Sequence, residues 1–344
     1  MKHIIEGKPA KQAAPIATSA VRIVEVDAEF AGQRLDNFLI RELKGVPKTH
    51  VYRIIRSGEV RINKGRASAD TRVAAGDLVR VPPVRVSEKV AEKQERPAPA
   101  REFPALLEDD HLIVIDKPAG VAVHGGSGVS FGVIEQLRQA RPQSRFLELV
   151  HRLDRETSGI LLVAKKRSAL TALQDQFRER ETGKTYLALV IGTWPARNKV
   201  IDVPLHKFLQ EDGERRVRTT TADDPDGMRS ITLVKVRETY APRPLQGLPA
   251  MSLLEVTIKT GRTHQIRVHL ASQGHPIVGD DKYGDFDLNK RVQKQGLKRM
   301  FLHAWRLQFN HPASQERVEM RAELPPELAD FLKTETITSN ASNA

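Results

Sequence analysis

The sequence predicts an α+β protein with two folded domains, a small one over residues 22–86 and a larger one over residues 105–335. The chain has 344 residues, about the length of two average domains. In the larger segment, strand-like runs outnumber helical ones and rarely alternate with them, which favours a largely antiparallel mixed sheet flanked by helices. Residues 87–104 are charged and rich in proline, which indicates a linker. We expect a flexible tail at residues 1–21 and a polar tail at 336–344.

The small domain is predicted to hold two helices followed by strands. Leu35, Phe38 and Leu39 recur at helical spacing, and Pro47 stands where a second helix can begin. Short apolar runs on either side of a turn then indicate a pair of strands. The expected elements are helices over residues 31–45 and 48–58, a strand–turn–strand over 59–67 and a strand over 77–83.

The larger domain is predicted to consist mainly of strands. Its apolar runs are short, rich in Leu, Ile and Val, and bounded by charged residues, Gly or Pro. The expected strands are residues 111–118, 159–166, 184–192, 231–238, 252–259 and 301–309. Two segments show helical periodicity instead. They are residues 168–180 and 263–274.

The composition excludes several classes of protein. Lys and Arg number 55 against 43 Asp and Glu, and the net charge of +12 favours a polyanionic partner over a merely well-solvated surface. The absence of cysteine removes disulfides, thiolate nucleophiles and zinc sites built on cysteine. No apolar run approaches the roughly 20 residues that a membrane helix needs. We therefore expect a cytoplasmic protein that does not enter a membrane.

Half of the positive excess lies in residues 41–66 of the small domain, which hold eight basic and two acidic residues. Such a patch binds the backbone of a nucleic acid without reading its sequence. The alternative is a solvated helix face without a partner. The candidate RNA-binding residues are Lys48, Arg53, Arg56, Lys64 and Arg66.

A charged loop of the larger domain, HRLDRETSG at residues 151–159, runs directly into an apolar strand. It places Asp154 at the mouth of that strand, between Arg152 and Arg155. One interpretation is an aspartate that caps a turn by accepting backbone N–H bonds. The other is a nucleophile or general base that a nearby cation keeps ionised. The loop by itself is compatible with both.

Two further segments carry residues suited to chemistry. Tyr186 lies early in the strand KTYLALVIG, where a tyrosine either packs in the sheet or accepts a proton from a substrate. Residues 260–284 gather arginines and histidines, including Arg267, around a helix. His264 and His269 are five residues apart, so they do not share a helical face, and no metal-binding pattern is present. We therefore predict no metal site.

Longer strings of residues point to a family. The order of elements in the small domain, with RLDNFL and GEVRINK, resembles the S4 RNA-binding domain. In the larger domain, HRLDRETSG, KTYLALVIG and TGRTHQIRVHLASQGHPIVGDDKYG are similar in order and spacing to the signature segments of the RluA family of pseudouridine synthases. The resemblance spans residues 22–335 and departs from the pattern at 221–250. It implies an S4 domain followed by a pseudouridine synthase catalytic domain.

The resemblance also implies roles for single residues. Asp154 matches the catalytic aspartate, Tyr186 the active-site tyrosine and Arg267 the basic residue that pairs with the aspartate. Arg152 matches the arginine that enters the RNA helix and helps to extrude the base, and Ile266 the apolar residue that lines the pocket. The candidate substrate-binding residues are completed by His151 and Thr157.

The implied substrate is 23S ribosomal RNA or a precursor of the large ribosomal subunit, with three target uridines, and the implied enzyme is a monomer. Isomerisation of uridine gains and loses no atom, so no cofactor is expected, in agreement with the lack of a nucleotide-binding fingerprint. Three alternatives stay open. They are a non-catalytic S4-type RNA-binding protein, an S4-fused RNA methyltransferase and a glycosylase that releases free uracil.

Overall fold

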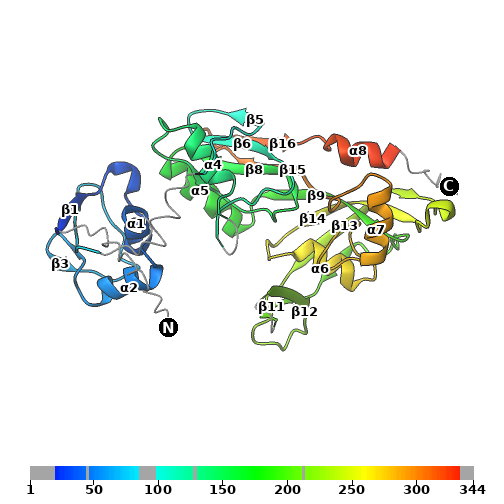
Figure 1. Cartoon of the computed structure of the whole chain (residues 1–344), viewed down its shortest axis with the longest axis horizontal. Helices are drawn as coiled ribbons and strands as arrows, with labels where there is room; N and C mark the ends of the chain where they lie inside the picture. Colours follow the sequence, from blue (N-terminus) through cyan, green and yellow to red (C-terminus); the bar gives the residue numbers. More distant parts are fainter. Residues whose placement is uncertain (1–19, 44–45, 85–97, 127–129, 211–213, 334–344) are drawn as a thin grey trace, which may run out of the picture. The chain divides into compact units, whose positions relative to one another are not determined.

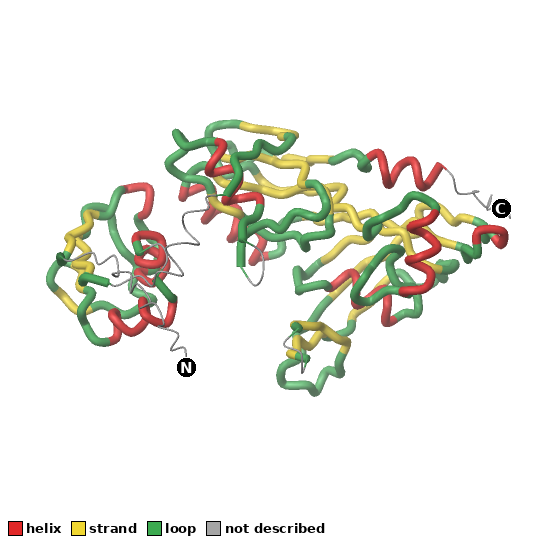
Figure 2. The backbone as a smooth tube through the Cα atoms, viewed as in Figure 1, coloured by secondary structure: helices red, strands yellow, loops and turns green. Residues whose placement is uncertain are grey.

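The computed structural model describes residues 20–43, 46–84, 98–126, 130–210 and 214–333 (Figure 1). The chain divides into two compact units between Pro97 and Ala98. Both units mix helices with strands (Figure 2), so the predicted α+β class is confirmed. The tails predicted at residues 1–21 and 336–344 and the linker at 87–104 fall mostly outside the described residues.

The first unit is a four-stranded antiparallel sheet with two helices packed against it. The strand order is β1-β4-β2-β3, with β1 at Arg22–Glu25, β2 at Arg61–Ile62, β3 at Gly65–Arg66 and β4 at Leu78–Val81. The two helices are α1 at Leu35–Glu42 and α2 at Lys48–Arg56, and a short 3-10 helix, η1, covers Ala28–Phe30. The apolar faces of α1 and α2 and the inner face of the sheet form one core.

Helix α1 begins four residues later than the expected start at residue 31. The residues before it pair with a distant segment instead: the Gly32 N–H donates to the Val73 carbonyl at 2.7 Å, and the Val73 N–H donates to the Gln33 carbonyl at 2.9 Å. Gly32 has a φ of 78°, a conformation that glycine adopts without steric cost. The chain therefore makes a turn here, and the helix starts only at Leu35, whose N–H donates to the Thr71 carbonyl.

The second unit is built on one mixed sheet with the strand order β10-β13-β14-β9-β15-β8-β6-β5, in which β16 pairs with β15 and β7 with β8. The one parallel pair among the described strands joins β15 to β8, so the predicted largely antiparallel sheet is confirmed. The strands are β5 at Ala105–Glu108, β6 at Leu112–Lys117, β7 at Glu148–Leu149, β8 at Ser158–Ala164, β9 at Gly183–Ile191, β10 at Val200–Asp202, β13 at Ile231–Tyr240, β14 at Met251–Ile258, β15 at Leu302–Asn310 and β16 at Arg317–Arg321.

A separate hairpin and several helices complete the second unit. The hairpin consists of β11 at Leu205–Leu209 and β12 at Arg215–Thr219. The helices are α4 at Val133–Ala140, α5 at Arg167–Glu179, η2 at Pro244–Gln246, α6 at Gln265–Ser272, α7 at Phe286–Lys294 and α8 at Pro326–Lys333. All predicted strands and helices are present within a few residues of their expected bounds. The hairpin, α4, α7, α8 and the short strands β1, β5, β7, β10 and β16 were not predicted.

Two hydrophobic cores share the large sheet. One lies between β6, β8 and α4, and the other between β9, β14, α6 and α7. Figure 1 shows α4 and α5 beside the β6–β8 half of this sheet, and α6 and α7 beside the β13–β14 half. Tyr186 on β9 packs against both cores. The boundary between the two halves of the second unit therefore passes through this tyrosine.

Candidate active site

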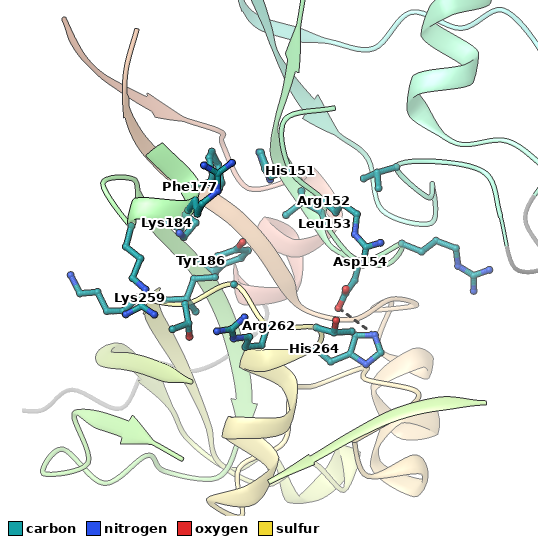
Figure 3. A pocket seen from close by; sticks show the side chains of 18 of the residues that line it. His151, Arg152, Leu153, Asp154, Phe177, Lys184, Tyr186, Lys259, Arg262 and His264 are labelled. Carbon is teal, nitrogen blue, oxygen red and sulfur yellow. Dashed lines mark ion pairs between the residues drawn. The ribbon is translucent and has the colours of Figure 1, made fainter. Parts of the chain in front are cut away.

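A cavity of about 920 Å³ opens in the second unit where three segments meet (Figure 3). They are the loop before β8, the first half of β9 and the loop between β14 and α6. Asp154, Tyr186 and His264 come from these three segments in that order and all line the cavity. Residues that are far apart in sequence thus face one space of the size that holds small ligands.

The loop that carries Asp154 is fastened to the end of β6 by a buried lysine. Lys117 is fully buried, and its ammonium donates to the carbonyl oxygens of Pro118, Val121 and Arg155 at 2.8, 2.8 and 3.1 Å. The three donors of the ammonium thus meet three acceptors, as a buried charged group requires. The bond to Arg155 fixes the backbone one residue beyond Asp154.

The start of β8 fixes the other side of the loop. Gly159 has a φ of 105°, and a Cβ at this position would lie 2.3 Å from the carbonyl oxygen of Ala304 on β15. Any other residue would therefore push the parallel pair apart. Ser158 is held as well, because its hydroxyl accepts from Arg299 at 2.7 Å and lies 2.8 Å from Nδ1 of His303. The backbone that positions Asp154 is consequently rigid at both ends.

Arg267 on α6 joins Asp154 to a second, buried carboxylate. Its Nε and Nη2 donate to the two oxygens of Asp280 at 2.7 Å each, and its Nη1 lies 3.4 Å from Oδ2 of Asp154. The side chains of Arg267 and Asp280 are 6% and 1% exposed, whereas that of Asp154 is 29% exposed. The bidentate bond to Asp280 fixes the guanidinium of Arg267 and leaves its Nη1 facing Asp154.

The ionised forms of Arg267 and Asp280 favour each other. Burial opposes ionisation of Arg267, but the hydrogen bonds and charge of Asp280, followed by the charge of Asp154, raise the pKa of Arg267 above its ordinary value. Burial likewise acts to raise the pKa of Asp280, but the hydrogen bonds and charge of Arg267 outweigh it, so the pKa of Asp280 is lowered. A fixed positive charge therefore stands beside Asp154 at neutral pH.

His264 and Tyr283 connect the cavity to the β11–β12 hairpin. The Nε2 of His264 lies 3.9 Å from Oδ2 of Asp154, and its Nδ1 lies 2.8 Å from the hydroxyl of Tyr283. That hydroxyl also accepts the backbone N–H of Val217 on β12 at 3.1 Å. His264 has a φ of 52°, unusual for a residue with a side chain. Its pKa is lowered, mainly by burial, although the charge of Asp154 acts in the opposite direction.

Tyr186 faces the cavity as a neutral phenol. Burial, and then the charge of Asp154, raise the pKa of Tyr186 well above the ordinary value of a tyrosine. Its hydroxyl therefore keeps its proton at neutral pH and can donate a hydrogen bond to a substrate or a water molecule. A tyrosinate that acts as a strong base at neutral pH is not compatible with this site.

Two other predicted substrate-binding residues also line the cavity. Arg152 is exposed, and its Nη1 lies 3.4 Å from Nε2 of His124. His151 stacks on Phe177 with ring centroids 4.7 Å apart, and its Nε2 accepts the Leu162 N–H at 3.1 Å. Burial lowers the pKa of His151 to about 4. His151 is thus a neutral part of the cavity wall, whereas Arg152 is free to meet a ligand.

The structure buries two of the residues that were predicted to bind substrate, Thr157 and Ile266. Both side chains are buried, at 2% and 5% exposure, and neither lines the cavity. Thr157 lies in the turn behind Asp154, where its N–H donates to the Asp154 carbonyl at 3.1 Å. Ile266 points into the core shared by β9, β14 and α6.

The basic residues of the first unit remain exposed. Lys48, Arg53, Arg56, Lys64 and Arg66 are all exposed, and none of them forms an ion pair within the described part of the chain. Tyr52, which lies among them, donates its hydroxyl to the Asp36 carboxylate at 3.1 Å. Lys64 occupies the tip of the β2–β3 hairpin with a φ of 71°. A polyanion can therefore approach these five cations without displacing a carboxylate.

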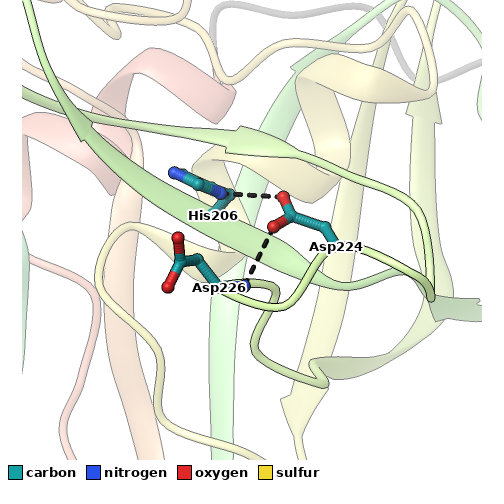
Figure 4. Close-up of side chains that lie close together, drawn as sticks. All are labelled: His206, Asp224 and Asp226. Atoms are coloured by element: carbon teal, nitrogen blue, oxygen red, sulfur yellow. Dashed lines mark hydrogen bonds and ion pairs between the residues drawn. The ribbon is translucent and has the colours of Figure 1, made fainter.

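A cluster outside the cavity brings together His206, Asp224 and Asp226 (Figure 4). One candidate ligand atom of each lies within 4.8 Å of the others. Hydrogen bonds account for this geometry: Oδ2 of Asp224 lies 2.8 Å from Nδ1 of His206 and accepts from Thr220 at 2.6 Å. The bonds from Thr220 and then His206 lower the pKa of Asp224 to about 2. The cluster fastens a loop of residues 220–227 to β11, and we assign it no ion.

A carboxylate held against a buried arginine in a cavity is the kind of arrangement found in catalytic sites, and the exposed basic face of the first unit suits a polyanion. The model of the RNA pseudouridylate synthase family matches residues 111–272, and that of the S4 domain matches residues 33–79. The chain belongs to the RNA pseudouridylate synthase family and is an RNA pseudouridine synthase, so the resemblance seen in the motifs is confirmed.

Two curated relatives and one solved structure illustrate the similarity. The chain is 50% identical over 316 residues to "Ribosomal large subunit pseudouridine synthase C" of Escherichia coli (strain K12), covering 90% of this chain and 94% of the relative. It is 49% identical to the protein of that name from Pasteurella multocida (strain Pm70), covering 92% and 94%. The structure of "Human RNA Pseudouridylate Synthase Domain Containing 1" is 26% identical, with a TM-score of 0.54, covering 71% of this chain and 91% of that one. None of the described helices is long and apolar enough to span a bilayer.

Proposed function

We propose that the protein converts specific uridines of 23S ribosomal RNA, in the large subunit or its precursor, to pseudouridine, with Asp154 as the catalytic group. The observation that carries the proposal is the Asp154 carboxylate, which faces the cavity 3.4 Å from a buried, permanently charged Arg267. The large-subunit substrate is carried over from the names of the relatives. We further propose three target uridines, action as a monomer and location in the cytoplasm.

The reaction breaks the bond between N1 of uracil and C1′ of ribose, turns the base and joins C5 to C1′. Asp154 either adds to C1′ or assists formation of a glycal by proton transfer, and both routes require an ionised carboxylate. Arg267 places a positive charge 3.4 Å from this carboxylate. In the last step C5 loses its proton and N1 gains one, so the atoms balance without a cofactor. The neutral Tyr186 hydroxyl, or a water that it orients, is placed to take part in this proton transfer.

The test is an incubation of the purified protein with an unmodified 23S ribosomal RNA transcript that carries tritium at C5 of uridine. The proposal predicts release of tritium to water and pseudouridine in the digested RNA. Release of free uracil would instead show a glycosylase. RNA binding without release of either would favour a binding protein. Either of these two results overturns the proposal.

Tyr186→Phe is expected to bind the RNA with wild-type affinity but to lower kcat about 100-fold, because it removes a positioned proton donor and acceptor while keeping the ring that packs between the two cores. The measurements are a filter-binding titration and single-turnover tritium release. Unchanged kcat in this variant would remove the tyrosine hydroxyl from the mechanism.

Arg152→Ala is expected to slow extrusion of the target base, which must leave its stack at a cost of a few kcal/mol. Arg152 lies two residues before Asp154, lines the cavity and has no carboxylate partner in the described structure, so it can occupy the vacated stack or hold a phosphate. The check is the fluorescence of a base analogue placed next to the target uridine. A wild-type signal in Arg152→Ala would count against this role. Arg155→Ala removes a second cavity-lining charge from the same loop and tests whether the effect belongs to Arg152 alone.

A further inference from the structure

Three cations line one cavity from three different elements. Lys184 comes from β9, Arg180 ends α5, and Lys259 follows β14. Within the residues that the structure describes, none of the three forms an ion pair. Figure 3 shows Lys184 and Lys259 on the side of the cavity that also carries Phe177, away from Asp154 and His264. This group is therefore separate from the Asp154–Arg267–Asp280 cluster.

Lys184 is the unusual member, because it is only 8% exposed. Its ammonium donates to the Thr182 hydroxyl at 3.1 Å and lies 5.2 Å from the centre of the Phe177 ring. Burial, and then the positive charges of Arg180 and Lys259, lower its pKa. A buried ammonium surrounded by like charges is unfavourable unless an anion joins it.

Arg180 adds an independent observation. It occupies the C-cap of α5 with a φ of 65°, a left-handed conformation that glycine usually supplies at this position. An arginine in this conformation carries backbone strain. Arg180 nevertheless lines the cavity together with Lys184, and its positive charge acts on the Lys184 ammonium.

We propose that Lys184, Arg180 and Lys259 form a subsite for a phosphodiester group of the RNA strand next to the target uridine. The inference deepens the proposed function and rests on it. Three cations and a hydroxyl suit the several acceptor oxygens of a phosphodiester. Lys184 and Tyr186 are two residues apart on one face of β9, so the phosphate would be held about 7 Å from the tyrosine that faces the base.

The test measures binding of an unmodified 23S ribosomal RNA fragment at a series of salt concentrations. Each lost phosphate contact lowers the slope of log K against log salt by about 0.7–0.9. Lys184→Met, which keeps the stem on Phe177, is expected to lower the slope by about that amount, and Lys184→Arg to preserve it. Arg180→Ala/Lys259→Ala changes two exposed residues, so we expect it to fold, and its loss of slope should be about the same as that of Lys184→Met, because both variants weaken one phosphate contact.

The matched control is Lys290→Ala/Lys294→Ala, which removes two exposed cations from α7, outside the cavity. It is expected to leave the slope unchanged, which shows that the effect is not one of net charge. Wild-type slopes in both Lys184→Met and the Arg180/Lys259 variant would overturn the subsite. Because the measurement needs no turnover, that result is distinct from a wild-type protein that binds but releases no tritium, which overturns the proposed function instead.

Discussion

Asp154→Asn is expected to fold, to bind 23S ribosomal RNA with wild-type affinity and to form pseudouridine at least about 10⁴-fold more slowly. The amide is close in size to the carboxylate, so the loop that Lys117 and the start of β8 hold in place should keep its backbone. It has no negative charge, however, and can neither add to C1′ nor accept a proton efficiently. Single-turnover tritium release and a thermal unfolding curve measure the two effects separately.

Glu156→Gln provides the control for Asp154→Asn, since it makes the same chemical change two residues further along the same loop. Glu156 pairs with Arg155 at 2.8 Å and does not line the cavity, so near-wild-type turnover is expected. Turnover of Asp154→Asn within tenfold of wild type would remove the aspartate from the chemistry and would leave the cavity without a catalytic carboxylate.

Arg267→Met is expected to lower the free energy of unfolding by about 3–5 kcal/mol as well as activity, because it leaves the carboxylate of Asp280 buried without its partner. The double variant Arg267→Met/Asp280→Asn removes both charges and should recover much of this stability. Its activity should stay low, since Asp154 still lacks the guanidinium. Urea unfolding and tritium release on the wild type, the single variant and the double variant test this. A double variant that regains activity would show that Arg267 acts only through the fold.

The same pair predicts the direction of a pH effect. The folded-state pKa of Asp280 lies below that of an unfolded aspartate, about 3.9, so its ionisation adds stability above that pH. This contribution is lost as the pH falls through the folded-state value. Between pH 5 and pH 2, the wild type should therefore lose more stability than Arg267→Met/Asp280→Asn, in which neither charge remains.

The fold was predictable where buried residues form apolar runs in the sequence. Strand β8 is buried at all of its residues, and after Ser158 and Gly159 it is an unbroken apolar run to Ala164. The β11–β12 hairpin was not predicted, because its strands, LHKFL and RRVRT, are only five residues each and do not alternate apolar with polar residues. Helix α7 was missed for a similar reason: its buried residues are few, and its start depends on the Asp285 carboxylate, which accepts the N–H groups of Asp287 and Leu288.

The candidate site could be predicted from the sequence only in part. The motifs named Asp154, Tyr186 and Arg267, and the fold brings all three to one place. Ile266 was expected in the pocket from the resemblance alone, and its side chain is 5% exposed and belongs to the core shared by β9, β14 and α6. Asp280 was missed because it lies thirteen residues from Arg267 in a run of acidic residues, and only its burial distinguishes it.

The most direct test of the account is to map pseudouridine in 23S ribosomal RNA by carbodiimide treatment and primer extension, in a strain that lacks this protein. We predict that the deletion removes specific stops, three by our proposal, that the wild-type gene restores them and that the gene encoding Asp154→Asn does not. An unchanged pattern in the deletion strain, or full restoration by Asp154→Asn, would contradict the central claim that this chain modifies large-subunit RNA through that aspartate.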